Sequence, residues 1–294
     1  MLILGGRGQL AADLLPLWPE ARAFAREELD IRDREAVRKA LAGARPRLVI
    51  NTAAMNQVDR AESEPAAGLE AFATNAIATA ALAAACRDVG AWLVHCSTDF
   101  VFDGRAREPY SEDAPARPLS VYGCSKLAGE ILVRASGANH AIVRSSGLYG
   151  AAGSRAKGGN FLSAILGRAE RGEPLRVVDD QVSAPTFTAD LARAIKDLTD
   201  RLSGHPEHSG VFHVTNAGET TWCAFARAFL ALKGIPAAIE GISSEAYASP
   251  ARRPAYSVLA NHRLRALGLE QPRPIIEALA AYVGAPVERA NTPS

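Results

Sequence analysis

The stretch LILGGRGQLA, residues 2–11, joins a short apolar run to a glycine-rich turn and the start of a helical pattern. Glycine lets the backbone approach a ligand closely, and a helix N-terminus attracts negative charge, so this order is typical of dinucleotide-binding folds. Ala11 takes the third position of the spacing, where a methyl group can be tolerated. A glycine-rich turn alone is equally compatible with a structural role. Its position directly after the first strand favours a dinucleotide, with Gly5 and Gly8 at the pyrophosphate.

The first half of the chain alternates short apolar runs with longer helical patterns. The runs predict strands at residues 2–4, 21–25, 48–50, 91–96 and 141–143, and the patterns predict helices at 9–17, 33–41, 66–89 and 122–135. Asp33 is placed to cap the second helix. Strands separated by helices, without a tight hairpin signal between them, predict a doubly wound parallel sheet of Rossmann type with helices on both faces. We assign this dinucleotide-binding domain to residues 1–146.

The second half, from residue 147, has a looser rhythm and proline-rich connectors. Helical patterns lie at 161–171, 188–202, 220–232 and 274–282, and apolar runs at 175–178 and 211–214 predict short strands. We therefore expect residues 147–285 to form mainly a smaller, mixed α/β lobe that binds the substrate. Residues 286–294 have no apolar periodicity and are expected to form a tail.

The composition excludes several classes of protein. The 294 residues carry 33 basic and 32 acidic side chains, a formal charge of +1, so bulk electrostatic binding of nucleic acid or of an anionic membrane is not expected. The longest apolar stretch, residues 78–86, is far shorter than the roughly 20 residues that span a bilayer. The four cysteines form no CxxC pair and have no metal-ligand spacing with histidine. With no signal-peptide pattern at the N-terminus, these features predict a cytoplasmic protein with reduced thiols and no bound metal.

Tyr122 and Lys126 carry the sharpest chemical signal. At an i, i+4 spacing their side chains lie on one face of the predicted helix, although an ordinary surface pair is the alternative. A nearby ammonium favours tyrosinate, so we expect Lys126 to lower the pKa of Tyr122 from its usual value of about 10 and to make it a proton donor or acceptor near neutral pH. Residues 97–99 (STD) end the fourth strand, where ligands bind in parallel sheets, and a hydroxyl there can hydrogen-bond a substrate carbonyl.

The end of the second strand bears on the choice of dinucleotide. An NAD site usually has an acidic residue there to bind the ribose 2′-hydroxyl, but residues 23–26 (AFAR) contain no carboxylate. Arg26 could instead pair with a 2′-phosphate, which favours NADPH; a solvated surface arginine is the alternative. The six histidines show no ligand spacing, and His95 and His213 are interpreted as structural residues with satisfied hydrogen bonds.

The order of the glycine-rich turn, residues 51–54 (NTAA), residues 97–99 and Tyr122-x-x-x-Lys126 resembles the extended short-chain dehydrogenases and reductases. Longer stretches narrow the resemblance to the dTDP-4-dehydrorhamnose reductase family: GQL at 8–10, LDI at 29–31, VDRAESE at 58–64, STDFVFDG at 97–104, residues 120–130, VDDQ at 178–181, PT at 185–186 and ARRPAYSV at 251–258. The resemblance covers the chain from residue 1 to about 283.

This resemblance implies reduction of the C4 keto group of a nucleotide-linked 4-keto-6-deoxyhexose by NADPH, with NADH as the second option. Tyr122 would donate the proton, Lys126 would hold the nicotinamide ribose, and Thr98 would hydrogen-bond the keto group. The residues expected to contact the cofactor are Gly5, Gly8, Gln9, Leu10, Arg26, Asp30, Ile31, Ala53, Ala54, Tyr122 and Lys126. Those expected to contact the substrate are Thr98, Asp99, Phe100, Tyr122, Arg252 and Arg253. For the arginine pair a solvated position is the alternative to binding the nucleotide pyrophosphate.

Several positions depart from the family pattern. The family usually has tyrosine at Phe100, tryptophan at Gly147, glycine at Ser183, asparagine at Tyr256 and aspartate at Ala260. Loss of a tryptophan at position 147 removes a large apolar wall from the expected sugar pocket, which bears on which sugar is bound. The resemblance also implies that the chain returns to the cofactor domain before it completes the substrate lobe, and it is compatible with a homodimer.

Two other functions stay open from the sequence. One is an epimerase or dehydratase of nucleotide sugars on the same scaffold, although dehydratases usually carry a glutamate directly after the Thr-Asp pair, where this chain has Phe100. The other is a nucleotide-binding regulatory subunit that has lost turnover, which the departures from the pattern favour. The presence of Thr98, Tyr122 and Lys126 favours a reductase.

Overall fold

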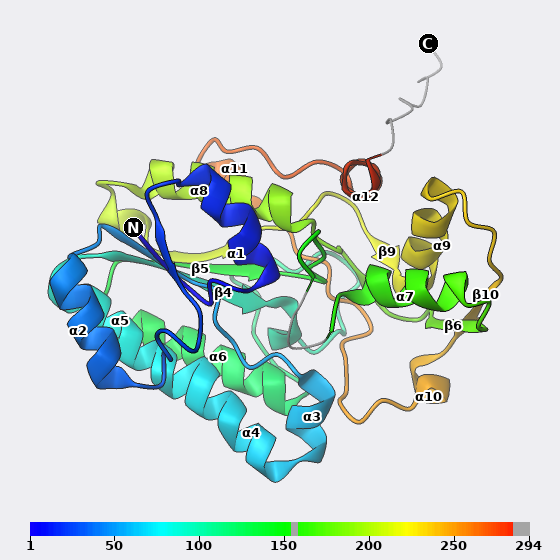
Figure 1. Cartoon of the computed structure of the whole chain (residues 1–294), viewed down its shortest axis with the longest axis horizontal. Coiled ribbons are helices and arrows are strands. Elements are labelled where there is room, and N and C mark those ends of the chain that lie inside the picture. Colours follow the sequence, from blue (N-terminus) through cyan, green and yellow to red (C-terminus); the bar gives the residue numbers. More distant parts are fainter. Residues whose placement is uncertain (154–157, 285–294) are drawn as a thin grey trace.

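A six-stranded parallel sheet forms the centre of the protein (Figure 1). The computed structural model describes residues 1–153 and 158–284, so the predicted tail at 286–294 lies outside the described residues. The strands occur in the order β2-β1-β3-β4-β5-β8. Their bounds are β1 Leu2–Leu4, β2 Arg22–Phe24, β3 Leu48–Asn51, β4 Trp92–Thr98, β5 His140–Ser145 and β8 Gly210–His213.

Helices cover both faces of this sheet, as the sequence predicts (Figure 1). On one face lie α1 (Gln9–Leu14) and α8 (Thr188–Leu202), and on the other α2 (Arg34–Ala44), α5 (Thr79–Val89) and α6 (Val121–Ala135). Successive side chains of a strand point to opposite faces, so Leu2 and Leu4 pack with α2 and α5 while Ile3 packs with α1 and α8. The doubly wound α/β fold is therefore confirmed.

One long helix runs from residue 65 to residue 89. It consists of α4 (Pro65–Phe72), a π-helical segment (Ala73–Ala78) and α5. The π-helical segment packs so closely on α6 that a Cβ at Gly129 would lie 2.1 Å from the Asn75 carbonyl oxygen. Residues 65–89 are long and apolar enough to cross a membrane, more than the run at 78–86 suggests, but half of the most apolar window is buried inside the protein.

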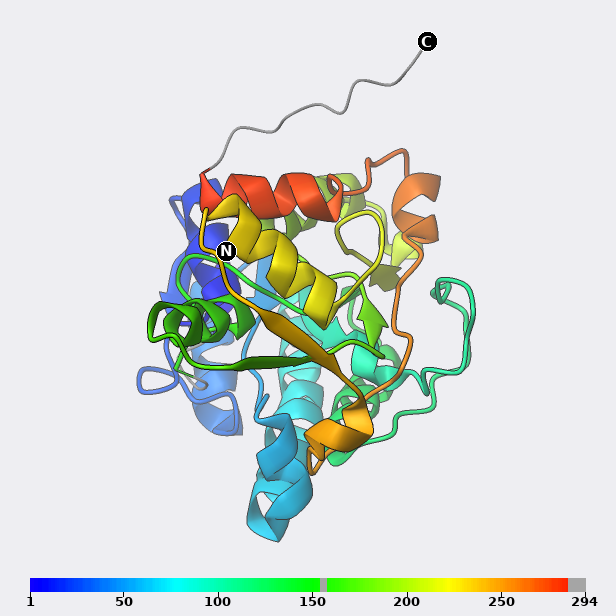
Figure 2. The same ribbon diagram turned by 90° about the vertical axis from the view of Figure 1, so that its right-hand side faces the viewer.

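The C-terminal half builds a second, smaller core beside the carboxyl edge of the sheet (Figure 2). There β6 (Leu175–Val178) pairs in parallel with β10 (Ile239–Ile242), and β7 (Val182–Ser183) pairs antiparallel with β9 (Thr220–Thr221). Figure 2 shows α12 (Ile275–Val283) in red beside α9 (Trp222–Leu232) in yellow, and α7 (Phe161–Glu170) in green packs on the same core. The same half also supplies β8 and α8 to the large sheet, so a cut at residue 146 separates the elements only approximately.

The local signals differ in how well they predict element ends. Asp33 caps α2 as expected, because its carboxylate accepts from the Ala36 N–H at 2.9 Å. The helix predicted at 220–232 begins only at Trp222. Its first two residues form β9 instead, and Thr221 caps the helix by accepting from the Ala224 N–H at 3.1 Å. The short helices α3 (Val58–Ser63), α10 (Ser244–Tyr247) and α11 (His262–Ala266) were not predicted.

Candidate active site

The glycine-rich turn forms a cradle at the start of α1. Gly5 has a φ of +82°, and a Cβ there would lie 2.8 Å from the Ala53 amide nitrogen, so only glycine fits. Gly8 is the N-cap of α1 in an extended conformation, and none of the described side chains caps the helix. The amide of Gln9 donates to the Leu148 carbonyl at 3.2 Å, while its Oε1 is buried without a partner among the described residues. A polar ligand such as a pyrophosphate fits this uncapped end.

The expected adenosine end of the site, after β2, is a cluster of charges. Arg26, whose side chain is 61% exposed, lies 3.4 Å from the Asp30 carboxylate and 3.3 Å from that of Glu70. Hydrogen bonds from Arg32 lower the pKa of Asp30 to about 2. The Glu28 carboxylate accepts from the Ala25 N–H at 2.7 Å, so a carboxylate does reach the strand end that the sequence left without one. Arg26 is therefore near its expected place but is already paired.

Thr98, Phe100 and Tyr122 meet at the carboxyl edge of the sheet. Thr98 is the last residue of β4, and Tyr122 lies in the first turn of α6, which Ser120 caps by accepting from the Gly123 N–H at 3.2 Å. The Tyr122 hydroxyl is hydrogen-bonded with the Thr98 side chain. The Phe100 ring meets the Tyr122 ring edge-on, with 5.9 Å between the ring centroids. The structure therefore brings together three of the residues predicted for catalysis and substrate binding.

The prediction that Lys126 lowers the pKa of Tyr122 is wrong for this structure. Burial raises the pKa of Tyr122 above its usual value, and Lys126 does not counteract the rise. The reason is that Lys126 Nζ, although on the same helix, donates to the Cys96 carbonyl at 2.6 Å and lies 3.4 Å from His95 Nε2. A raised pKa keeps the Tyr122 phenol protonated at neutral pH, which suits a proton donor.

The Asp99 carboxylate is hydrogen-bonded with side chains from three segments of the chain. Its buried carboxylate accepts from the Ser146 hydroxyl at 2.8 Å and from the Thr98 hydroxyl at 3.1 Å, and it is also hydrogen-bonded with Ser257. Burial raises the pKa of Asp99. Neither Ser146 nor Ser257 was predicted as a site residue. Ser146 directly follows β5, so the rule that ligand sites gather at the carboxyl ends of strands could have found it. Ser257 offers no such signal.

Trp222 from the second core packs against Gly147, the position where the family usually has a tryptophan. Gly147 has a φ of +53°, and a Cβ there would lie 2.9 Å from Trp222 Cη2 and 3.2 Å from the Pro185 Cα. Trp222 is held edge-on to Phe161, with 4.8 Å between ring centroids. Gly147 directly follows Ser146, whose hydroxyl donates to Asp99, so the indole packs one residue along the chain from a contact of the candidate site. Trp222 was missed because only the pairing of β7 with β9 brings it here.

Gly147→Trp, which restores the residue usual in the family, should lower the free energy of unfolding by about 2 kcal/mol, because the new side chain overpacks against Trp222. Urea denaturation would measure the change. The control is Trp222→Ala alone and combined with Gly147→Trp. We expect the double variant to lose less stability than the sum of the two single variants, and strict additivity would contradict the overlap of the two side chains.

Among the described residues, neither of the two C-terminal arginines is hydrogen-bonded to Thr98 or Tyr122. Arg253 forms a two-pronged ion pair with Asp59 of α3, at 2.9 and 2.8 Å, and also donates to the Ser249 hydroxyl at 2.8 Å. It thus ties the C-terminal segment to the stretch VDRAESE. Arg252 is exposed. Arg253 would have to leave or share Asp59 to bind a phosphate.

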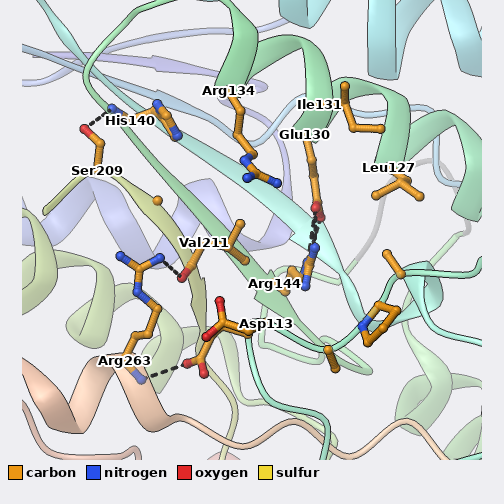
Figure 3. A pocket seen from close by; sticks show the side chains of 15 residues that line it. Asp113, Leu127, Glu130, Ile131, Arg134, His140, Arg144, Ser209, Val211 and Arg263 are labelled. Atoms are coloured by element: carbon orange, nitrogen blue, oxygen red, sulfur yellow. Dashed lines mark hydrogen bonds and ion pairs between the residues drawn. The ribbon is translucent and has the colours of Figure 1, made fainter.

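A cavity of about 620 Å³ is lined by residues of α6, β5 and β8 and by the segment 112–116 (Figure 3). Figure 3 shows Arg134, Arg263 and the ion-paired side chains of Glu130 and Arg144 among the residues that line it. Its lining includes none of Thr98, Tyr122 and Lys126, so it is separate from the candidate site. Across residues 1–153 and 158–284, no three His, Cys, Asp or Glu side chains are grouped so that they could hold a metal ion.

Comparison with known proteins places this geometry in a family. The family model described as RmlD substrate binding domain matches residues 1–286. The chain is 42% identical to a dTDP-4-dehydrorhamnose reductase of Streptomyces griseus, over 99% of this chain and 95% of that protein. It is 38% identical to a dTDP-4-keto-6-deoxy-D-glucose reductase of Streptomyces niveus, over 91% of each. A crystal structure of dTDP-4-dehydrorhamnose reductase from Bacillus anthracis in complex with NADP superposes with a TM-score of 0.88 at 33% identity, over 96% of this chain and 97% of that one. The resemblance seen in the sequence is confirmed: the chain belongs to the RmlD family of sugar-nucleotide oxidoreductases, together with the dTDP-4-dehydrorhamnose reductases.

Proposed function

We propose that the protein reduces the C4 keto group of a dTDP-linked 4-keto-6-deoxyhexose, of the dTDP-4-dehydrorhamnose type, with NADPH as the reductant. The observation that carries the proposal is the hydrogen-bonded pair of Thr98 and Tyr122 at the carboxyl edge of β4. Two hydroxyls on rigid elements can hold a carbonyl oxygen and give it a proton. The names of the relatives from Streptomyces griseus and Streptomyces niveus support the substrate class, and the NADP complex from Bacillus anthracis supports the cofactor.

The residues of the site supply proton transfer and positioning. Bound NADPH supplies the hydride that reaches C4 of the sugar. Tyr122 then loses its phenolic proton to the keto oxygen, which leaves a C4 hydroxyl and a Tyr122 phenolate. The Thr98 hydroxyl, which donates to Asp99 in this structure, would turn its single proton from Asp99 to the same oxygen. Lys126, on the same helix face as Tyr122, is proposed to hold the nicotinamide ribose.

The direct test is oxidation of NADPH by the purified protein supplied with dTDP-4-keto-rhamnose. We expect loss of NADPH absorbance with one dTDP-rhamnose formed for each NADPH consumed. A tightly retained NAD with no net use of NADPH would instead indicate an epimerase or dehydratase. Good binding of NADPH without turnover of any dTDP-4-keto-6-deoxy sugar would overturn the reductase and indicate a regulatory subunit.

Arg26→Ala should raise the KM for NADPH about tenfold and change the KM for NADH by less than about twofold. A tenfold effect corresponds to about 1.4 kcal/mol, just below the usual value for a hydrogen bond to a charged group, because Arg26 is exposed and shared with two carboxylates. Steady-state kinetics with both cofactors would measure it. Arg38→Ala, which removes a similarly exposed arginine paired with Glu35 on α2, is the control. Equal effects on both cofactors would refute a 2′-phosphate contact.

A further inference from the structure

Lys126 is buried, and its ammonium group meets β4 in two places. Nζ donates to the Cys96 carbonyl at 2.6 Å and lies 3.4 Å from Nε2 of His95. Lys126 is 1% exposed and His95 is fully buried, so no solvent reaches the contact. The other nitrogen of the imidazole ring, Nδ1, lies 3.2 Å from the side-chain amide of Asn51 on β3. A continuous polar path therefore runs from Asn51 through His95 to Lys126.

The orientation of Asn51 decides which nitrogen of His95 carries the proton. The Asn51 Oδ1 accepts from the Ala53 N–H at 3.1 Å, so its Nδ2 is the atom that faces His95. Because Nδ2 is a donor, Nδ1 of the ring must accept. A neutral imidazole with an accepting Nδ1 has its proton on Nε2, and that N–H points at Lys126. Only an uncharged amine at Nζ can accept from Nε2 and still donate to the Cys96 carbonyl.

We propose that His95 is a positioning residue for Lys126, held by Asn51 as the Nε2–H tautomer, and that its N–H favours the neutral amine over the ammonium. The inference rests on the proposed role of Lys126 at the nicotinamide ribose. His95 would then have a function in addition to the one predicted from the sequence, that of a structural residue with satisfied hydrogen bonds.

The pKa values of Lys126 and His95 are both shifted in the direction that the proposal requires. Burial lowers the pKa of Lys126 to about 8, although the Cys96 thiol on β4 and the Glu130 carboxylate on α6 act to raise it. Burial and the neighbouring Lys126 lower the pKa of His95 well below its usual value, so the ring stays neutral. Since Tyr122, the remaining titratable neighbour on α6, has a raised pKa, Lys126 is the group expected to titrate first as the pH rises above 7. We therefore expect kcat/KM to fall as the pH passes about 8.

The test is an NMR titration of the protein labelled with ¹³C at the lysine Cε atoms, without substrate or cofactor. The chain has five lysines, and the Lys126→Met variant identifies the resonance of Lys126. In His95→Gln an amide oxygen becomes available to the ammonium, so the pKa of Lys126 should rise by about one unit, a tenfold gain in proton affinity. His95→Phe keeps a ring but neither nitrogen, and we expect a value between those of the wild type and His95→Gln. The alkaline limb of kcat/KM should move by the same amounts.

Wild-type values of the Lys126 pKa in both variants would overturn the proposal. Should the variants fail to fold, ¹⁵N labelling of the histidines in the wild-type protein still decides the matter, because the proposal requires a neutral His95 protonated at Nε2 between pH 6 and pH 9. A proton on Nδ1 would overturn it. Neither NMR experiment involves turnover, so a protein without reductase activity would refute the proposed function and leave these two results standing.

Discussion

Tyr122→Phe should lower kcat for NADPH-dependent reduction by about 10²–10⁴-fold and leave the KM for NADPH nearly unchanged. The change removes one oxygen, the atom that is hydrogen-bonded with Thr98, and leaves the edge-on contact with Phe100 in place. Burial raises the pKa of Tyr122, so in the wild type the phenol keeps its proton until the substrate oxygen takes it. Initial rates with saturating dTDP-4-keto-rhamnose measure kcat, and cofactor fluorescence measures NADPH binding separately.

The matched control is Tyr247→Phe, the same change at a tyrosine that is 58% exposed on α10. It should leave both constants as in the wild type. Thr98→Val forms a second arm, since it removes the other hydroxyl at the keto oxygen, and we expect a loss of about 10²-fold in kcat. If Tyr122→Phe kept more than a tenth of the wild-type kcat, the proton would have to come from another group.

Much of the fold could be predicted because short stretches of sequence determine where its strands and helices form. The alternation of apolar runs and helical patterns predicted the order along the chain of the strands and helices that form the large sheet. Asp33 marked the start of α2. The spacing of Tyr122 and Lys126 correctly placed them on one helix. Single-sequence patterns of this kind report a residue and its neighbours within a turn or a strand. They fail where a distant segment decides the outcome, as at residues 220–221, which pair with β7 instead of continuing a helix.

The candidate site depends more on such distant segments than the fold does. Asp99 binds Ser146, Arg253 binds Asp59, and Trp222 lies against Gly147, and each contact joins segments whose meeting no spacing predicts. The direction in which a side chain points is equally invisible in a sequence. Lys126 has the predicted position on α6, yet its ammonium faces β4, and so the predicted effect on the pKa of Tyr122 is absent. Residue type and spacing thus predicted the participants, whereas burial and hydrogen bonding decide their proton affinities.

Removal of Arg144 should lower the free energy of unfolding by about 3–5 kcal/mol, because it leaves the buried Glu130 carboxylate without its ion-pair partner. The two side chains are 5% and 2% exposed, and their ion pair has its shortest contact at 2.6 Å. The Ser97 hydroxyl also donates to Glu130, and the guanidinium lies over the Phe102 ring. In Arg144→Met the stranded carboxylate binds a proton more readily in the folded than in the unfolded protein, so the deficit should shrink as the pH falls towards 5. Urea denaturation at pH 5 and pH 8 measures both effects.

The pair joins α6 to β4 and β5 directly behind the catalytic residues, so its loss should loosen the helix that carries Tyr122 and Lys126. A double variant, Arg144→Met with Glu130→Met, removes both charges, and we expect it to regain most of the stability, because a buried ion pair contributes little beyond what apolar packing supplies. Arg38→Ala breaks the exposed pair with Glu35 and should cost less than about 0.5 kcal/mol. A loss in Arg144→Met as small as that of Arg38→Ala, with no dependence on pH, would show that Glu130 finds other partners. If instead the double variant recovers stability but not kcat, the charges themselves are needed to hold α6 in its active position.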